Sequence, residues 1–188
     1  MVVKALADVA RAGAGEQSWS AICAQVGSDD HFVGTRDYPE ELVGDLVAAV
    51  AVALGASREE VLHRLGRHWI RYTAQEGWGP LLQALGPDLV TALGRLDGLH
   101  VRVGLALPHL RPPSFQVVDV SPDGLVLLYR STRTGLEPMV CGLVEELGQV
   151  FDCPVAVTHD GRRDGAAVFA VRFVPAHEVL TAEQVVPS

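Results

Sequence analysis

The sequence predicts an α+β fold in which a helical N-terminal part is followed by a ββαββ unit with a four-stranded antiparallel sheet. Residues 1–110 repeat apolar side chains at helical spacing. Pro108, Pro112 and Pro113 then stop helix formation. After these prolines, short strand-like segments follow in two pairs, and a turn sequence joins the members of each pair.

The helical part has its clearest start signal at Ser57. Ser57 and Glu60 form a capping box, in which each side chain binds a backbone N–H of the first turn, so we expect a helix from here to about Gln75. Gly55 ends the helix before it. The other helices expected in this part are 4–11, 18–26, 42–54, 81–85 and 88–107, the last interrupted around Gly98.

The second part begins with a predicted β-hairpin. Strands are expected at 114–120 and 125–131, around the turn sequence Ser121-Pro122-Asp123-Gly124. An amphipathic helix at 138–151 follows, and then strands at 155–159 and 166–173 around a turn at 160–165. We interpret residues 1–175 as a single domain with subdomains 1–60 and 61–175, and residues 176–188 as a tail.

Composition and charge limit the classes of partner. The 188 residues carry 15 Lys and Arg against 23 Asp and Glu, a net charge of −8, which argues against binding to nucleic acid or to an anionic membrane. The longest apolar run, 46–55, is too short to span a bilayer, and the N-terminus lacks a signal-peptide pattern. We therefore expect a cytoplasmic protein, with Cys23, Cys141 and Cys153 as buried thiols.

His100 lies in a sequence that would place it on an apolar helix face. Leu96 precedes it by four residues and Val103 follows it by three, so the three side chains would share one side of a helix. An imidazole in that position is either a hydrogen-bonded neutral core residue or a metal ligand through one ring nitrogen. The local sequence alone favours the core residue.

Two further patterns are open to more than one interpretation. Tyr129, Ser131 and Arg133 would project from one strand face and could donate hydrogen bonds to carboxylates, although the short pattern alone favours a strand end that runs into solvent. Arg111-Pro112-Pro113 is a rigid segment that could press against a flat ligand or simply link two parts of the chain.

The patterns occur in a fixed order along the chain. LDGLH (96–100), RPPSF (111–115) and YRSTR (129–133) follow one another, with Trp19 and YTAQEG (72–77) upstream. In this order and spacing the chain resembles the H-NOX family of bacterial haem-based gas sensors, which are related to the haem domain of soluble guanylate cyclase. The similarity runs from about residue 4 to residue 173.

The resemblance implies that non-covalent haem b lies between the two parts of the chain. It implies that His100 is the proximal iron ligand, that Tyr129, Ser131 and Arg133 hold the propionates, and that Pro113 packs against the porphyrin and keeps it bent. These roles suit haem, a flat apolar disc with carboxylates at one edge and a metal at its centre.

The resemblance also bears on the opposite, distal side of the haem, where gases bind. Met139 stands where relatives that hold oxygen carry a tyrosine; Leu6 is the expected first-helix distal residue, and Trp69 stands where those relatives carry a polar side chain. NO binds ferrous iron without a hydrogen-bond donor, whereas bound oxygen gains from one. We therefore expect binding of NO, weaker binding of CO and disfavoured binding of O2, and no structural zinc site.

The function that the resemblance implies is sensing and not catalysis. NO would release His100 and relax the haem, and a stand-alone sensor would signal to a separate protein, either a histidine kinase or a cyclic-di-GMP enzyme. A haem-binding or storage module without gas signalling is the alternative. An enzyme built on Tyr129, Ser131 or Arg133 ranks third, because no nucleophile–base pair is visible near them.

Overall fold

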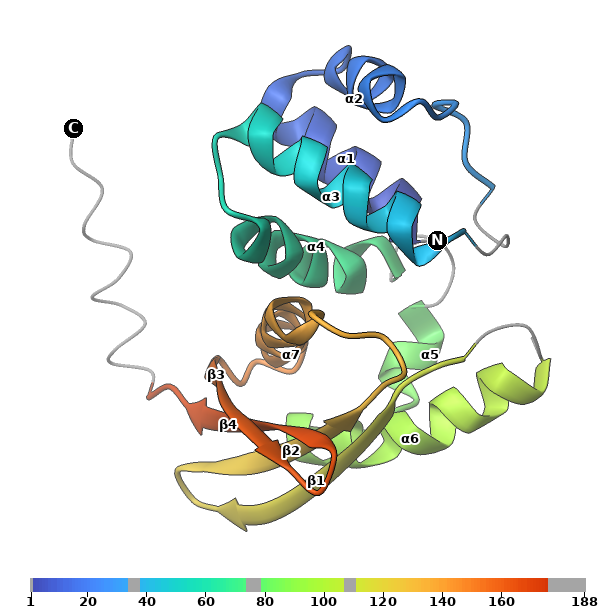
Figure 1. Cartoon of the computed structure of the whole chain (residues 1–188). Coiled ribbons are helices and arrows are strands. Elements are labelled where there is room, and N and C mark those ends of the chain that lie inside the picture. Colours follow the sequence, from blue (N-terminus) through green and yellow to red (C-terminus); the bar gives the residue numbers. More distant parts are fainter. Residues whose placement is uncertain (1, 34–37, 74–78, 107–110, 176–188) are drawn as a thin grey trace, which may run out of the picture.

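The computed structural model describes residues 2–33, 38–73, 79–106 and 111–175 (Figure 1). The N-terminal part within these ranges consists of α1 (Val2–Ala14), α2 (Ser18–Val26), α3 (Glu40–Leu54) and α4 (Arg58–Thr73). These helices enclose a first hydrophobic core, and its largest fully buried side chains include Trp19, Leu6, Leu46 and Leu65. Burial of such apolar surface is the main force that holds the helices together.

The capping box at the start of α4 is confirmed. The backbone N–H of Ser57 donates to Oε2 of Glu60 at 2.7 Å, and the backbone N–H of Glu60 donates to Oγ of Ser57 at 3.1 Å. α4 ends at Thr73 in the described part of the chain, and the expected continuation to Gln75 lies outside the described residues.

The second part combines helices with an antiparallel sheet. Its elements are α5 (Gly79–Gln83), α6 (Leu89–Ala106), β1 (Ser114–Ser121), β2 (Gly124–Arg130), α7 (Glu137–Val150), β3 (Val155–Arg163) and β4 (Ala166–Phe173). The strand order is β1-β2-β4-β3, and every neighbouring pair is antiparallel. Side chains from all three helices and from the sheet form a second hydrophobic core. The predicted α+β class and its four-stranded antiparallel sheet are confirmed.

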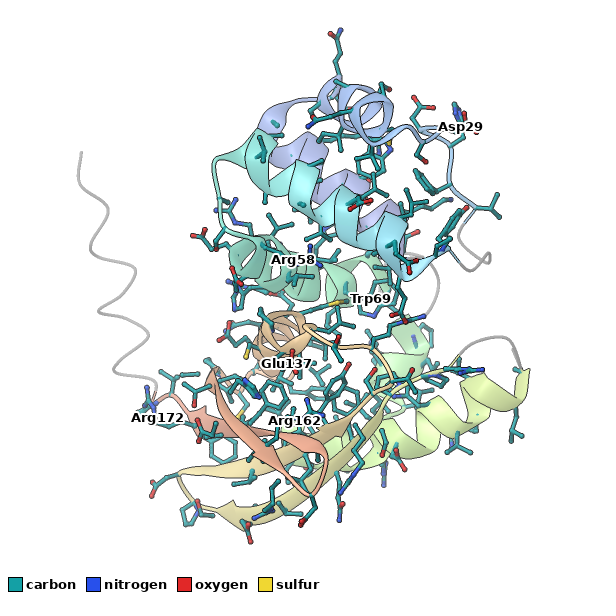
Figure 2. The ribbon with its side chains drawn as sticks, viewed as in Figure 1. Asp29, Arg58, Trp69, Glu137, Arg162 and Arg172 are labelled. Carbon is teal, nitrogen blue, oxygen red and sulfur yellow. The ribbon has the colours of Figure 1, made fainter. Side chains whose placement is uncertain are left out.

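The two parts meet where α4 packs on α7. A Cβ on Gly66 would overlap the carbonyl oxygen of Met139, and a Cβ on Gly142 would overlap that of His63, so each helix uses a glycine to approach the other's backbone. The side chain of Trp69 packs against both hydrophobic cores and lies between the two parts in Figure 2.

Charged side chains add to the same interface. Glu146 is buried on α7 and accepts hydrogen bonds from Arg67 Nε at 3.0 Å and from Arg71 Nε at 2.6 Å. α4 contributes apolar side chains to both cores, so it does not belong to one part alone. The division into subdomains 1–60 and 61–175 stays a prediction. The expected tail at 176–188 lies outside the described residues.

Several expected element bounds differ from those in the structure, and the expectation of three buried thiols is wrong for Cys141 and Cys153, which are only partly buried. α6 continues through Gly98 without a break, because a glycine in an open helical position costs stability but does not end the helix. β3 continues past His159 to Arg163. The strand register shifts between His159 and Arg162, after which Arg162 and Arg163 pair with β4 again, so the turn between β3 and β4 is shorter than expected. β2 ends at Arg130, one residue earlier than expected. No helix in the described ranges is both long enough and apolar enough to cross a bilayer.

Candidate functional site

His100 lies on α6 with its imidazole turned towards the segment that precedes β1. Nδ1 is 2.8 Å from the carbonyl oxygen of Pro113, and because a carbonyl can only accept, Nδ1 carries the proton and donates. This tautomer leaves Nε2 with its lone pair. A histidine that donates from one ring nitrogen to a carbonyl is in the usual state for binding a metal through the other.

The surroundings of His100 keep the ring neutral. Burial lowers its pKa below the ordinary value of 6.5, against the opposing effects of the hydrogen bond to Pro113 and of the charge on Asp97. The imidazole is therefore uncharged at neutral pH, which is the form that binds iron. α6 also lies close to the proline pair, because a Cβ on Gly104 would be 3.7 Å from Cγ of Pro112.

Aromatic rings connect His100 with the sheet. The centroid of the His100 ring lies 5.6 Å from that of Phe115, which lies 5.2 Å from that of Tyr129. Phe115 on β1 and Tyr129 on β2 are direct partners in the strand register, so the backbone pairing fixes this contact. The result is an apolar wall that begins at the candidate ligand and ends at the first residue of the YRSTR motif.

Tyr129 is buried at the end of that wall. Burial raises the pKa of its phenol above 10.0, while a hydrogen bond with the Ser131 side chain lowers it. The hydroxyl thus remains protonated at neutral pH and can donate. This contact with Ser131 brings together the first two of the three side chains expected to hold carboxylates.

Arg133 lies near Tyr129 and Ser131, but a turn places it there and not the strand alternation that was expected. Strand alternation cannot place it beside Tyr129, because β2 ends at Arg130 and residues 131–136 form a loop. A turn does so instead: the backbone N–H of Arg133 donates to Oγ of Ser131 at 3.0 Å. Its guanidinium Nε lies 3.4 Å from Oε1 of Glu40 at the start of α3, so Arg133 joins the two parts of the chain.

The three expected distal residues belong to the other core. Leu6 is fully buried on α1, and the partly buried side chains of Trp69 and Met139 pack against the same cluster. Thr73 Oγ donates to the carbonyl oxygen of Trp69 within α4. His100 and Tyr129 flank the second core, whereas Leu6 and Met139 contact the first core, Met139 from α7 of the second part, and Trp69 contacts both cores.

The donor set fits haem. The neutral imidazole of His100 would supply a nitrogen ligand for the iron, and aromatic side chains adjoin this imidazole. The phenol of Tyr129, the hydroxyl of Ser131 and the guanidinium of Arg133 follow this wall along the chain and are donors of the kind that could hold propionates. Across the described ranges, no three His, Cys, Asp or Glu side chains gather in a way that could hold a metal ion.

A family model described as Haem-NO-binding matches residues 1–159 of this chain. The chain belongs to this family, the H-NOX domains. Members of the family are haem-binding gas-sensor domains, and the predicted resemblance is confirmed.

Curated relatives of this H-NOX chain are soluble guanylate cyclases. Cyclase 89Db of Drosophila melanogaster is 28% identical over 138 residues, which cover 73% of this chain and 21% of the cyclase. Cyclase gcy-35 of Caenorhabditis elegans is 35% identical over 144 residues, which cover 74% of this chain and 20% of the cyclase. The chain thus spans about a fifth of the length of each of these relatives.

Solved H-NOX structures share the fold. The unliganded Fe(II) H-NOX protein from K. algicida superposes with a TM-score of 0.79 at 17% identity, covering 93% of this chain and 95% of that one. An oxygen-binding H-NOX domain related to soluble guanylate cyclases, solved as its oxygen complex, gives a TM-score of 0.73 at 23% identity, with 92% of each chain covered. At these identities the likeness concerns the fold alone.

The sequence did not indicate several polar contacts of this H-NOX domain. His63 and His68 are both half-buried on α4: Nε2 of His63 lies 2.8 Å from Glu145, and Nε2 of His68 lies 3.3 Å from Asp8. The partners are 82 and 60 residues away along the chain, so no local pattern could pair them. The role of Glu40 beside Arg133 was missed for the same reason.

Proposed function

We propose that this chain binds haem b with His100 as the proximal iron ligand and acts as a sensor of NO. The observation that carries the proposal is the 2.8 Å contact between His100 Nδ1 and the Pro113 carbonyl, because it fixes the tautomer that presents Nε2. The same contact ties the candidate ligand to the proline segment that would support the porphyrin. Pro113 would then contribute both a carbonyl that orients His100 and a rigid ring against the macrocycle.

The carboxylate end of the site is proposed to be Tyr129, Ser131 and Arg133. Tyr129 is held protonated by burial, and Ser131 orders the backbone of Arg133 through the bond to its N–H. Charge-assisted hydrogen bonds from a guanidinium to a carboxylate are among the strongest that proteins make. Hence Arg133 should contribute most to holding the propionates.

The distal side is proposed to favour NO. Met139 and Leu6 offer no N–H or O–H donor, and the indole N–H of Trp69 is the one donor among the three expected distal side chains. Ferrous haem, when bound, would supply the iron to which NO binds, and His100 would be the ligand that NO binding weakens. We expect binding of NO, weaker binding of CO and poor retention of O2.

Signalling is proposed to follow from the release of His100. Its bond to Pro113 would keep the imidazole with α6 and the proline segment, so both would move together relative to the helical part. Ligand binding can shift such an equilibrium only by its difference in affinity for the two arrangements. The output would go to a cytoplasmic histidine kinase or cyclic-di-GMP enzyme as a separate protein, and the chain itself would not be an enzyme.

An absorption and resonance Raman experiment tests the proposal. The purified protein is titrated with hemin, reduced without oxygen and exposed to NO. We expect stoichiometric haem binding, a five-coordinate ferrous state with a histidine ligand, and a five-coordinate nitrosyl. A protein that takes up no hemin contradicts the whole proposal, and a stable six-coordinate nitrosyl that retains His100 contradicts the release step.

A further inference from the structure

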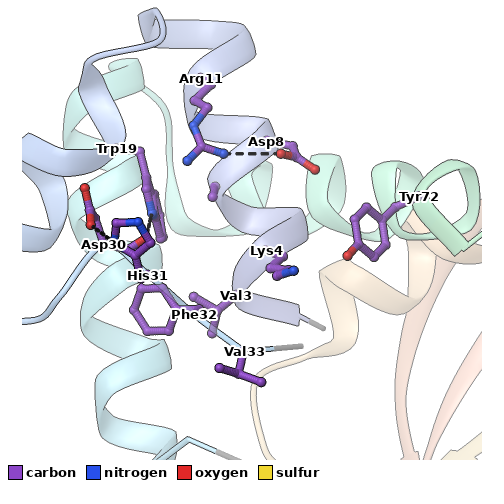
Figure 3. A pocket seen from close by; sticks show the side chains of 11 residues that line it. Val3, Lys4, Asp8, Arg11, Trp19, Asp30, His31, Phe32, Val33 and Tyr72 are labelled. Atoms are coloured by element: carbon purple, nitrogen blue, oxygen red, sulfur yellow. Dashed lines mark hydrogen bonds and ion pairs between the residues drawn. The ribbon is translucent and has the colours of Figure 1, made fainter. Parts of the chain in front are cut away.

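A cavity is lined by residues other than those proposed for the haem site. It has a volume of about 550 Å³ and is bounded by α1, by α2, by residues 30–33 and by Tyr72 of α4 (Figure 3). None of the eight residues proposed to hold haem or to face its ligand lines it. The volume falls within the range of small-molecule sites in proteins, roughly 300–1,000 Å³.

One side of this cavity is an ordered aromatic wall. The side chain of Trp19 is 1% exposed, and its indole N–H donates to the carbonyl oxygen of Asp30 at 3.2 Å. Phe32 packs edge-on to Trp19 with ring centroids 5.8 Å apart, and Phe32 lies 5.0 Å from Tyr38 in the same way. Val33 is more than half exposed beside it. These contacts hold the apolar wall in place without a ligand.

The carboxylates of the cavity already have partners. Asp8 lies 3.5 Å from Arg11 Nη1 and 3.3 Å from His68 Nε2. Asp30 accepts from Ser20 Oγ at 2.6 Å and lies 2.6 Å from His31 Nδ1, and the hydrogen bond from Ser20 is the largest of the effects that lower the pKa of Asp30. Neither acid is therefore available to neutralise a further cation.

Lys4 differs from the other charged groups of the cavity. It is the single lysine of the chain, its side chain is exposed, and no hydrogen bond or ion pair reaches its ammonium from the residues that the structure describes. Figure 3 places it on α1, the helix that carries Asp8 and Arg11, on the side of that helix towards Tyr72. The cavity thus combines an aromatic wall with one uncompensated positive charge.

We propose that this cavity binds a small amphipathic carboxylate, with its apolar body against Trp19 and Phe32 and its carboxylate at Lys4. A carboxylate would gain an attraction to the ammonium that an uncharged apolar ligand would lack, and a cationic ligand would be repelled by it. A medium-chain fatty acid and an arylalkanoic acid both have the required chemistry. None of the residues proposed to hold haem lines the cavity, so the carboxylate would not compete with haem for the same side chains.

Calorimetric titration tests the site on the protein as purified. Octanoate represents the medium-chain fatty acids and 3-phenylpropionate the arylalkanoic acids. 1-Octanol and octylammonium are the matched uncharged and cationic probes. We expect one of the acids to bind at a single site below its micelle concentration and the two other probes to bind at least about fivefold more weakly. The proposal would be overturned if neither acid bound, or if 1-octanol bound as tightly as the acid that does bind.

Two surface variants keep this test separate from folding. Lys4→Gln should weaken binding of the acid about fivefold, and Val33→Asp should weaken it further through charge repulsion, while Arg64→Gln on the exposed side of α4 should leave it unchanged. Lys4 and Val33 are both exposed, so neither change should alter the midpoint of thermal unfolding. Equal affinity in Lys4→Gln and the native chain would contradict the assigned role of Lys4.

Chemical acetylation gives a second readout, since Lys4 is the chain's one ε-amine. A saturating concentration of the bound acid should slow acetylation of Lys4 by an N-hydroxysuccinimide ester, measured by mass spectrometry, whereas 1-octanol should not. Unchanged acetylation in the presence of the bound acid would place the ligand elsewhere and overturn the site. A chain that takes up no hemin but passes both tests would refute the proposed function and leave this inference standing.

Discussion

Gly66 of α4 lies so close to Met139 of α7 that a single added methyl group would overlap the Met139 carbonyl oxygen. Gly142 stands in the reciprocal relation to His63. Both overlaps involve helix backbone, which cannot move aside as the end of a flexible side chain can. The junction between the two parts of the chain therefore depends on the absence of two side chains.

Gly66→Ala should force α4 and α7 apart and lower the free energy of unfolding by about 3 kcal/mol, the cost of overpacking a close contact. Gly94→Ala on α6 is the matched control, because a Cβ there meets nothing and alanine favours a helix by up to about 1 kcal/mol. Urea unfolding of both variants checks this. If Gly66→Ala were as stable as the native chain, the close packing of the two helices would be wrong.

Glu146→Gln should lower stability at neutral pH by about 1–2 kcal/mol, since Arg67 and Arg71 are half-exposed and partly screened by solvent. Burial tends to raise the pKa of Glu146, but hydrogen bonds from Arg71 and Arg67 and their charges hold it below the ordinary 4.5. This stabilisation is fully present above that ordinary value and is lost as the pH falls through the lowered value.

The stability difference between the native chain and Glu146→Gln should therefore narrow on acidification. Urea unfolding from pH 7 down through the acid range measures it, with Glu59→Gln at the exposed start of α4 as the control. A difference that stays constant to the lowest pH would show that the carboxylate charge of Glu146 does not stabilise the interface.

These interfaces mark the limit of what the sequence could predict. Apolar periodicity and turn residues predicted the elements, because both are local properties, and Ser57 with Glu60 predicted the start of α4. The contact of Glu146 with Arg71 joins residues 75 apart, and only the folded chain brings them together. For the candidate site, the order of the motifs predicted that His100 and Arg133 belong to one site. The predicted strand alternation does not explain the position of Arg133, because β2 ends at Arg130 and a turn at Ser131 follows.

Arg133→Gln should accelerate transfer of hemin to an acceptor protein about tenfold, which corresponds to the loss of one charge-assisted hydrogen bond of about 1.5 kcal/mol. Arg130→Gln is the matched control, because its neighbour Tyr129 points into the core and Arg130 is exposed. Transfer rates followed by absorbance distinguish the two variants. Equal rates in Arg133→Gln and Arg130→Gln would remove Arg133 from the propionate site.

Met139→Tyr should place a hydroxyl donor on the proposed distal side and slow the loss of O2 from the ferrous protein about tenfold, again the value of one hydrogen bond. Met139→Phe has nearly the same shape without the hydroxyl and should have no such effect. Stopped-flow mixing of the oxygen complexes with CO measures the rates. If both variants lose O2 equally fast, residue 139 does not face the bound gas.

The resonance Raman spectrum of the reduced protein without added gas tests most directly whether His100 is the proximal iron ligand. His100→Gly should lose the iron–histidine band, and added imidazole should restore an iron–nitrogen band by occupying the space left beside Pro113. An iron–histidine band that persists unchanged in His100→Gly would contradict the account.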